Sequence, residues 1–428
     1  MKWRMRYLTM FISALLLVTL SFVLWTSNQK KILRIGVYAG SSWDVPNSRE
    51  NRVLDNIIHQ FEKSHPNVKV VYESGIPKKD YDNWLAEKIL KGEQADVFMV
   101  PENDFSMLAS SGAFKSLDSL ISKEEAATYY PVAYQAGQYQ GNSYALPIES
   151  NPVMMCVNKD LLEKEGISIP DSNWTLEDLY AICQKVTKDT DGDGLIDQYG
   201  ITDYTWKQAL VAYNGHLRNQ NGVNIDSVEM HQALSFISKL DSLNQRYKVT
   251  SNDFDEGKVA FYPMSLAQYR TYKPYPYHVA KYSRFSWTCI PMPAAKAGIP
   301  ATQVKTSLFA MSSKTKQDKL AWEFMKLLCQ NQKNQQELFA KSQGTSVLTS
   351  VVKSSQTKKI LQADDFGLDS LTSQRLDHMM KHSVLDISRD LDYHSLERLD
   401  YLLGNALKNN EIDSILPSIQ REMEETGK

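Results

Sequence analysis

The stretch "GNSYALPIESNPVMMCVNKDLLEKEGISIPDSNWTLEDL", residues 141–179, decides the fold. Its runs "SYALPI" (143–148) and "VMMCVNK" (153–159) have the apolar composition of β-strands. A helix follows, opened by an N-capping Thr175 with Asp178 three residues later. Two strands and a helix in succession indicate that the middle of the chain packs helices against a sheet.

Before this stretch, strands alternate with helices. The predicted strands are "ILRIGVY" (32–38), "VKVVYES" (68–74) and "ADVFMV" (95–100), and the predicted helices cover 49–65, 79–93 and 103–112. In the first helix, Val53, Ile57, Ile58 and Phe61 fall on one face. Such alternation indicates βαβ units with a largely parallel sheet, so the predicted fold class is α/β.

After this stretch the alternation is less regular. Residues 258–264 and 285–292 predict two further strands. Residues 316–341 predict one long amphipathic helix with its apolar side chains on one side. Beyond Val347 the chain is predicted to be helical throughout.

Length and charge limit the classes of protein that fit. The chain has 428 residues, 42% of them hydrophobic, and a formal charge of −2. This length favours two domains over one. The near-neutral charge argues against a nucleic-acid partner, which requires a basic face.

The four cysteines each lie in an apolar context, at Cys156, Cys183, Cys289 and Cys329. An even number in an exported protein permits disulfides. Buried free thiols are favoured, because a large domain does not need a covalent cross-link and free cysteine is among the most buried residue types. No spacing of Cys and His indicates a zinc site.

The N-terminus predicts where the protein works. Lys2, Arg4 and Arg6 precede an apolar run at 7–25, which is about long enough to cross a bilayer. No A-x-A cleavage site follows. We therefore expect residues 1–30 to form a membrane anchor rather than a cleaved signal peptide. The body of the chain is then exported, because the positive residues before the run stay in the cytoplasm.

The order of segments resembles a known family, the extracellular solute-binding proteins of ABC importers of the carbohydrate, maltose-binding-like type. The resemblance covers essentially the whole chain after the anchor. It is carried by residues 141–179 and by four further segments: "ADVFMVPENDFSMLASSGAFKSLDSLI" (95–121), "GKVAFYPM" (257–264), "AAKAGI" (294–299) and "TSLFAMSSKTKQDKLAWEFMKLL" (306–328). The chain departs from many relatives in having no Cys after the apolar run to accept a lipid.

The resemblance implies a two-lobed, type II periplasmic-binding-protein fold. One lobe would comprise 31–147 with 291–346, and the other 148–290 with 347–428, with crossovers near Glu149–Asn151, Ile290 and Val347. It also implies a monomer that needs no cofactor. Its lobes would close on a carbohydrate, and a membrane permease would recognise the closed form.

Polar or aromatic residues after the strands of the first lobe are candidate ligand contacts, because a closed cleft must pair the polar groups of its ligand. Trp43 stands in a polar loop, where it has no helix face to pack against. Asn103 and Asp104 could instead cap a helix. Glu73 could equally be a solvated surface residue, and the resemblance places Glu149 and Asn151 on the crossover. The candidates are Ser42, Trp43, Glu73, Glu102, Asn103, Asp104, Glu149 and Asn151.

The second lobe offers aromatic candidates. Trp206, Tyr262 and Trp287, together with Ser265, could form a wall on which a sugar ring stacks. Each aromatic residue taken alone is more often part of a core than of a binding platform. The loops are acidic and have no cluster of Arg, which disfavours phosphate or carboxylate ligands.

The segment "KDTDGDGLIDQYG" (188–200) resembles part of a calcium loop. Asp189, Asp191, Asp193 and Asp197 stand at positions 1, 3, 5 and 9 of the EF-hand pattern, and Leu195 could offer its carbonyl at position 7. Position 12, which normally holds a bidentate Glu, is Gly200. Two interpretations stay open, a weak structural Ca²⁺ site and a tight turn that needs no metal.

Two other functions are alternatives. An exported glycan-active enzyme could use paired carboxylates, but no G-x-S-x-G or H-E-x-x-H motif is present. A sensor component could signal to a membrane partner, which a transmembrane tether would suit. The importer component is the function that the resemblance favours.

Overall fold

The computed structural model describes residues 30–43, 50–73, 75–245, 247–272, 285–364 and 370–426. The predicted anchor, residues 1–30, lies outside these ranges except for Lys30. Within them, no helix is both long enough and apolar enough to cross a membrane.

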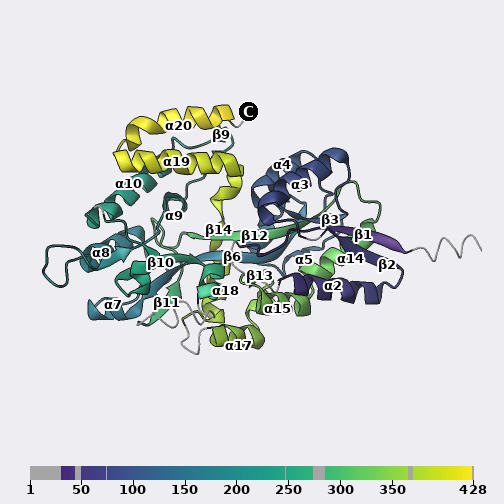
Figure 1. Cartoon of the computed structure of the whole chain (residues 1–428), viewed down its shortest axis with the longest axis horizontal. Coiled ribbons are helices and arrows are strands. Elements are labelled where there is room, and N and C mark those ends of the chain that lie inside the picture. The colour runs from purple at the N-terminus through teal and green to yellow at the C-terminus, as the bar shows by residue number, and fades with distance from the viewer. Residues whose placement is uncertain are drawn as a thin grey trace, which may run out of the picture.

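The described chain forms two lobes side by side (Figure 1), connected through one sheet with the strand order β2-β1-β3-β12-β6-β10-β7. The first lobe contains β1 (Lys31–Gly36), β2 (Val68–Tyr72) and β3 (Val97–Val100), with α2 (Glu50–Ser64), α3 (Lys78–Lys91), η1 (Glu102–Asp104) and α4 (Phe105–Ser110). Strand β1 pairs in parallel with both β2 and β3. The predicted βαβ units of this lobe are therefore confirmed.

Strand β6 (Ala145–Asn158) is the central strand of the connection between the lobes. The two strands predicted at 143–148 and 153–159 were wrong as separate elements, because the polar residues between them continue the ladder. Ser150 stands opposite Thr306 of β12 (Thr302–Met311), and the two hydroxyl oxygens are 2.9 Å apart. A polar residue need not end a strand when its side chain finds a partner across the ladder.

The directions of the strands follow the path of the chain between the lobes. The second-lobe end of β6 pairs antiparallel with β10 (Val259–Ser265) and β11 (Trp287–Ile290), and β10 pairs in parallel with β7 (Tyr199–Ile201). Strand β12 also runs antiparallel to β6, because β6 leads out of the first lobe and β12 leads back. The α/β fold is confirmed, although the sheet is antiparallel around the crossover rather than mostly parallel.

The single helix predicted at 316–341 was wrong. The structure has α14 (Asp318–Cys329) and α15 (Gln332–Lys341), with Asn331 between them. The side chain of Asn331 accepts a hydrogen bond from the amide of Asn334 at 3.1 Å, so it caps a new helix instead of continuing the old one.

The segment after Val347 is helical except in one place. Strand β14 (Ser383–Leu385) pairs in parallel with β12 and adds an unpredicted strand to the sheet. The helices of this segment are α16 (Thr349–Val352), α17 (Ser355–Asp364), α18 (Ser373–Lys381), η2 (Ile387–Asp390), α19 (Tyr393–Asn409) and α20 (Ile412–Thr426).

Further elements complete the two lobes. The helices are α5 (Lys123–Ala126), α6 (Pro131–Ala136), α7 (Lys159–Lys164), α8 (Leu176–Val186), α9 (Trp206–Ala212), α10 (Val228–Leu243), α11 (Ser251–Asp255) and α12 (Leu266–Tyr272). The strands are β4 (Gln138–Tyr139), β5 (Asn142–Ser143), β8 (Arg218–Asn219), β9 (Gly222–Val223) and β13 (Thr345–Ser346). The predicted capping box of Thr175 and Asp178 is present at the start of α8.

Two apolar cores hold these elements together. Leu361 of α17 and Leu376 of α18 belong to the core that contains the first-lobe strands. Leu399 of α19 and Leu416 of α20 belong to the other core, with Leu234 of α10. The last two helices therefore pack on the second lobe, while α17 and α18 share the core of the first. The lobe boundaries given above stay a prediction.

Candidate ligand-binding site

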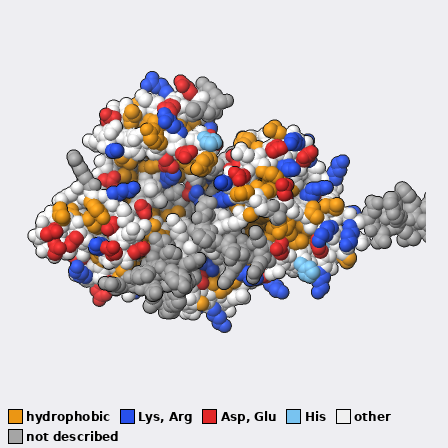
Figure 2. Space-filling view, viewed as in Figure 1, with side chains coloured by type: hydrophobic (Ala, Val, Ile, Leu, Met, Phe, Trp, Pro, Cys, Tyr) orange, Lys and Arg blue, Asp and Glu red, His pale blue; other side chains and the backbone are white. Residues whose placement is uncertain are grey.

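The two lobes face each other across a hollow. Figure 2 shows it between the part of the first lobe that carries α3 and α4 and the part of the second that carries α19 and α20. Helix η1, after β3, contacts η2, which precedes α19. The guanidinium of Arg389 lies 5.5 Å from the ring centre of Phe105 and donates to the carbonyl of Ala136 at 3.1 Å. The loop after β3 and the segment before α19 therefore meet where the lobes join.

Carboxylates from three segments lie close enough to influence one another here. Burial raises the pKa of Asp104, and the charges of Asp82 in α3 and Asp392 before α19 add to this rise, which brings the pKa to about 6 in total. Asp104 stands at the N-cap position of α4, yet its side chain makes no capping hydrogen bond with the described residues. Desolvation also raises the pKa of Asp82, although this residue is exposed at the surface. The charge of Lys78 acts in the opposite direction and lowers that pKa. Asp104 is thus left for another partner.

The segment before α19 supplies residues that the sequence analysis missed. The side chain of Asp392 caps α19, accepting from the amide of Ser395 at 3.0 Å. Tyr393 follows it and has 62% of its surface exposed, so its ring is available for contact. A polar residue at a helix start followed by Tyr393 was the signal in the sequence, but only the fold brings η2, which precedes α19, into contact with η1.

Glu149 of β6 lies at the centre of a second polar group. It is buried, and its Oε1 accepts from the amide of Gly344 at 2.7 Å and from the hydroxyl of Ser342. Burial raises the pKa of this carboxyl, while the hydrogen bonds from Ser342 and Gly344 and the nearby indole N–H of Trp43 lower it, and the resulting pKa is about 7. The indole N–H lies near Glu149 but outside strict hydrogen-bond geometry. Ser42 and Glu149 also line one cavity of ≈ 70 Å³.

The peptide at Gly344 connects Glu149 to the second lobe. Arg270 of α12 donates from Nη1 to the carbonyl of Gly344 at 2.9 Å. The amide of Gly344 donates to the carboxylate of Glu149. A Cβ on Gly344 would lie 2.4 Å from Oε1 of Glu149, so only glycine fits this position without rearrangement. Glu149 and Arg270 therefore hold the crossover from both sides.

The model of one family, described as bacterial extracellular solute-binding protein, matches residues 56–364. The chain belongs to this family. Because that family binds solutes, membership supports a binding function rather than an enzymatic one.

Several known proteins similar to this solute-binding protein have sugar-related names. It is 25% identical over 138 residues to the maltotriose-binding protein of Pyrococcus abyssi, a match that spans 32% of this chain and only 30% of that protein. The sugar-binding protein MalE from Xanthomonas citri superposes with a TM-score of 0.74 at 15% identity, covering 92% of this chain and 97% of that one. The cyclic alpha-maltosyl-1,6-maltose binding protein from Arthrobacter globiformis gives a TM-score of 0.71 at 14% identity, with coverages of 92% and 98%. These structures establish the shared fold.

Two predicted contacts of the solute-binding protein are helix caps. The side-chain oxygen of Asn151 accepts from the amide of Ala267 in α12 at 2.9 Å, and Asn151 is buried. The hydroxyl of Ser265 accepts from the amide of Gln268 at 3.2 Å, at the start of the same helix. In the structure both groups satisfy free amides at the start of a helix, and their contact with a ligand stays a prediction.

The predicted aromatic wall is corrected. Tyr262 and Trp287 are buried around Phe254, at centroid distances of 5.3 Å and 5.7 Å. Trp206 is buried too, and its indole N–H donates to Asp400 at 2.8 Å. Tyr262 and Trp287 belong to the core that also contains the first-lobe strands, and Trp206 belongs to the other core, so all three rings stabilise the fold.

The remaining first-lobe candidates lie in two places, after β2 and in η1. Glu73 is exposed and lines a groove with Trp84 and Lys88. Asn103 is half-buried in η1, beside Asp104. The backbone of Glu102 belongs to the same short helix, but its side chain lies outside what the structure describes.

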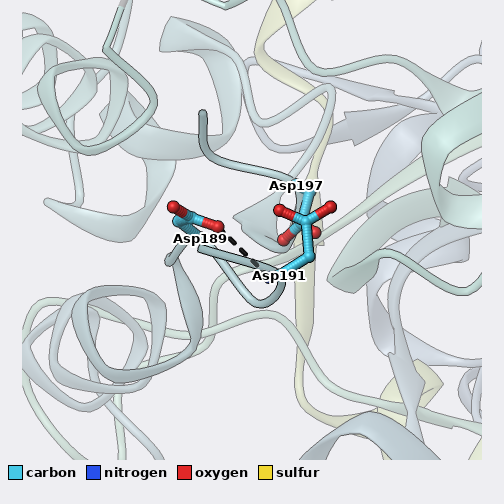
Figure 3. A group of neighbouring side chains, drawn as sticks. All are labelled: Asp189, Asp191 and Asp197. Atoms are coloured by element: carbon cyan, nitrogen blue, oxygen red, sulfur yellow. Dashed lines mark hydrogen bonds between the residues drawn. The ribbon is translucent and has the colours of Figure 1, made fainter. Parts of the chain in front are cut away.

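The acidic loop of the solute-binding protein brings together three of its four aspartates. One carboxylate oxygen from each of Asp189, Asp191 and Asp197 lies within 4.8 Å of the others, and Figure 3 shows Asp189 facing the other two. Asp193 is outside this group, with its carboxylate accepting from the amide of Leu195 at 2.8 Å. Gly200, at position 12, lies in β7. The donor set fits a hard cation, but with fewer ligands than a full calcium loop.

Proposed function

We propose that this solute-binding protein captures a neutral oligosaccharide in the hollow and delivers it to the permease of an ABC importer. The observation that carries the proposal is the contact of η1 in the first lobe with η2 in the second, where the charges of Asp82 and Asp392 help to raise the pKa of Asp104. Carboxylates are strong acceptors for sugar hydroxyls, because hydrogen bonds to charged groups are stronger than neutral ones. Tyr393 offers the exposed ring that a sugar face can cover.

The names of similar proteins support the ligand class. Maltotriose and a cyclic maltosyl-maltose are both oligosaccharides of glucose. We therefore propose a glucose oligosaccharide as the first ligand to test. Because this chain spans less than a third of the maltotriose-binding protein, the resemblance supports a class of ligand rather than one compound.

The proposed mechanism is closure about the crossover. Strands β6 and β12 run between the lobes, and Glu149 and Arg270 both bind the peptide of Gly344 beside them. Bending there would bring Asp392 and Tyr393 down on a sugar that already contacts Asp104. The permease would then recognise the closed form, which the ligand stabilises by its greater affinity for it.

We propose that the protein works as a monomer held at the extracytoplasmic face of the membrane by residues 1–30. The apolar run at 7–25 and the basic residues before it support this placement. Pull-down of a permease with the full-length chain supports the importer role. Pull-down of a kinase in its place would favour the sensor alternative.

We propose further that the acidic loop binds Ca²⁺ weakly and serves stability. Three convergent carboxylates support it. Asp189 and Asp197 are already engaged by backbone amides and by Thr190, so the loop keeps its turn without a metal. An affinity of about 10⁻⁴ to 10⁻³ M is expected for a site with an incomplete ligand set.

The experiment that tests the ligand class is a thermal-shift screen of the full-length chain against linear and cyclic glucose oligosaccharides. A ligand at about 100 times its Kd adds about 2.7 kcal/mol to the free energy of unfolding. We expect dose-dependent shifts from this class and no turnover of the sugar. Glycan hydrolysis would favour the enzyme alternative, and no shift from any glycan would refute the proposed ligand.

The matched variants for this screen are Asp104→Asn and Glu177→Gln. The first removes a carboxylate from the hollow, and the second removes an exposed carboxylate from α8. We expect only Asp104→Asn to reduce the shift that the sugar produces.

A further inference from the structure

Two of the four cysteines face each other across neighbouring strands. Cys156 of β6 and Cys289 of β11 are partners in the antiparallel register, and their sulfurs are 3.6 Å apart. Both side chains are fully buried. Cys183 belongs to the core of the second lobe, whereas Cys329 lies in α14 within the other core. The chain therefore contains one pair whose positions are set by the sheet.

The geometry of this pair fits a covalent bond. Directly opposed residues of an antiparallel ladder have their Cα atoms about 4.5–5.5 Å apart, within the range of about 4.4–6.8 Å that disulfides use. Bond formation would bring the sulfurs closer by about 1.6 Å, to the usual length near 2.05 Å. Rotation of two side chains can supply a movement of this size.

The chemical environment fits as well. The chain belongs to a family of extracellular proteins, and disulfides form and persist outside the cytoplasm. We propose that Cys156 and Cys289 are joined by a disulfide in the exported protein, and that Cys183 and Cys329 stay free thiols. This proposal rests on the extracellular family and on the strand register, and not on the identity of the ligand.

The reaction is thiol–disulfide exchange with a disulfide-bearing oxidant, either a small disulfide or an oxidoreductase. One cysteine thiolate attacks the oxidant and forms a mixed disulfide, which releases one thiol. The second cysteine thiolate then attacks the sulfur of the first and releases the other thiol. The protein loses two electrons and two protons, and the oxidant gains them. Because both sulfurs are fully buried after folding, the exchange takes place before β11 packs against β6.

The bond would stabilise the second-lobe side of the hinge. Strand β6 enters the second lobe from the first, and the chain after β11 returns to β12. A link between Cys156 and Cys289 closes a loop across a sequence separation of 133 residues and ties the outgoing strand to the returning one. Bending would then be confined to the first-lobe side of the pair, near Glu149.

Counting thiols tests the proposal directly. The full-length chain, exported by its host cell, is purified without reductant, denatured, alkylated and weighed by mass spectrometry. We expect two alkyl groups per chain, and a peptide map in which the segment of Cys156 is linked to that of Cys289. Four alkyl groups, or a link between any other pair, would overturn the proposal.

Melting curves with and without reductant give a second readout. The melting temperature of the wild type should fall by about 5–10 °C when reductant is present, because closing a long loop stabilises mainly through the unfolded chain. Cys156→Ala and Cys289→Ala should be insensitive to reductant, and Cys183→Ala should behave as the wild type. An equal response to reductant in Cys156→Ala and wild type would contradict the bond. If the variants do not fold, the thiol count of the wild type decides alone.

Discussion

Two groups of side chains differ in their surroundings: the carboxyl groups of Asp82 and Asp104 are desolvated in the first lobe, whereas the rings of Tyr262 and Trp287 are packed in the apolar core. Desolvation raises the pKa of both Asp82 and Asp104, so their ionised forms cost stability while no ligand is bound. Tyr262 and Trp287 are buried around Phe254 and contribute stability. This difference agrees with the proposal that the first group serves a ligand, while the second group serves the fold. Substitutions in the two groups should therefore affect different measurements.

The largest expected effect is on the aromatic side of the comparison. Trp287→Ala should lower the free energy of unfolding by about 3–5 kcal/mol, because it leaves a cavity beside Phe254 and Tyr269. Urea denaturation measures the loss. The sugar affinity of the molecules that remain folded should be unchanged. A variant of normal stability with weak sugar binding would mean that Trp287 is a ligand contact after all.

The second largest effect on stability is expected at the crossover between the lobes. Gly344→Ala should lower the free energy of unfolding by about 1–3 kcal/mol, since its Cβ would overlap the carboxylate of Glu149. The matched control is Gly404→Ala in the exposed middle of α19, where a Cβ meets no atom of the described chain within 4 Å. The control should gain up to about 1 kcal/mol, because Ala has the higher helix propensity. Equal changes in both variants would contradict the tight fit at Gly344.

Asp104→Asn tests the carboxylate group of this comparison through the dependence of stability on pH. The pKa of Asp104 is about 6 in the folded chain against an ordinary value of 3.8, so the folded state binds more protons between these values. The wild type therefore loses stability as the pH rises through this window, and the cost is absent below it. The variant should melt above the wild type at neutral pH and equal to it below pH 3.8.

The same variant should bind sugar about tenfold more weakly, which calorimetry measures, because a hydrogen bond to a charged group is lost. A gain in stability together with a loss of affinity is the sign of a residue kept for binding. Higher stability with unchanged affinity would remove Asp104 from the site.

The smallest effect concerns the acidic loop. Ca²⁺ at about ten times a Kd of 10⁻³ M should add about 1.4 kcal/mol to the free energy of unfolding. Asp189→Asn should abolish this increment, and Glu177→Gln should keep it. Comparison with Mg²⁺ at the same concentration separates binding from ionic strength. An equal response to both ions in all three proteins would leave the loop as a turn without a metal.

Local signals in the sequence predicted much of the fold. The first-lobe strands, the capping box at Thr175 and the α/β class all follow from patterns of a few residues. The continuity of β6 did not, because the bond between Ser150 and Thr306 joins residues far apart in the chain. Likewise, the sequence did not predict the break at Asn331 between α14 and α15. An Asn can cap a helix with its side-chain oxygen, as Asn331 does, or lie within a helix.

The site was less accessible to sequence reasoning, for the same reason. A polar residue after a strand lies near the edge of the sheet whatever the fold, which places Ser42, Trp43 and Asp104 approximately. Whether an aromatic residue is exposed depends on its neighbours across the sheet, which the sequence does not reveal. The influence of Asp392 on Asp104 joins segments that are far apart in the sequence, so no local pattern marks it.

The measurement that tests the central claim most directly is a distance between the lobes. Spin labels at Ser110→Cys in α4 and Glu397→Cys in α19 occupy exposed positions on opposite sides of the hollow, whereas the native cysteines are buried. A control pair at Lys79 and Ser110 lies within the first lobe. We predict that a saturating glucose oligosaccharide shortens the distance between the lobes and leaves the control distance unchanged. An unchanged distance between the lobes at saturating sugar would contradict capture by closure.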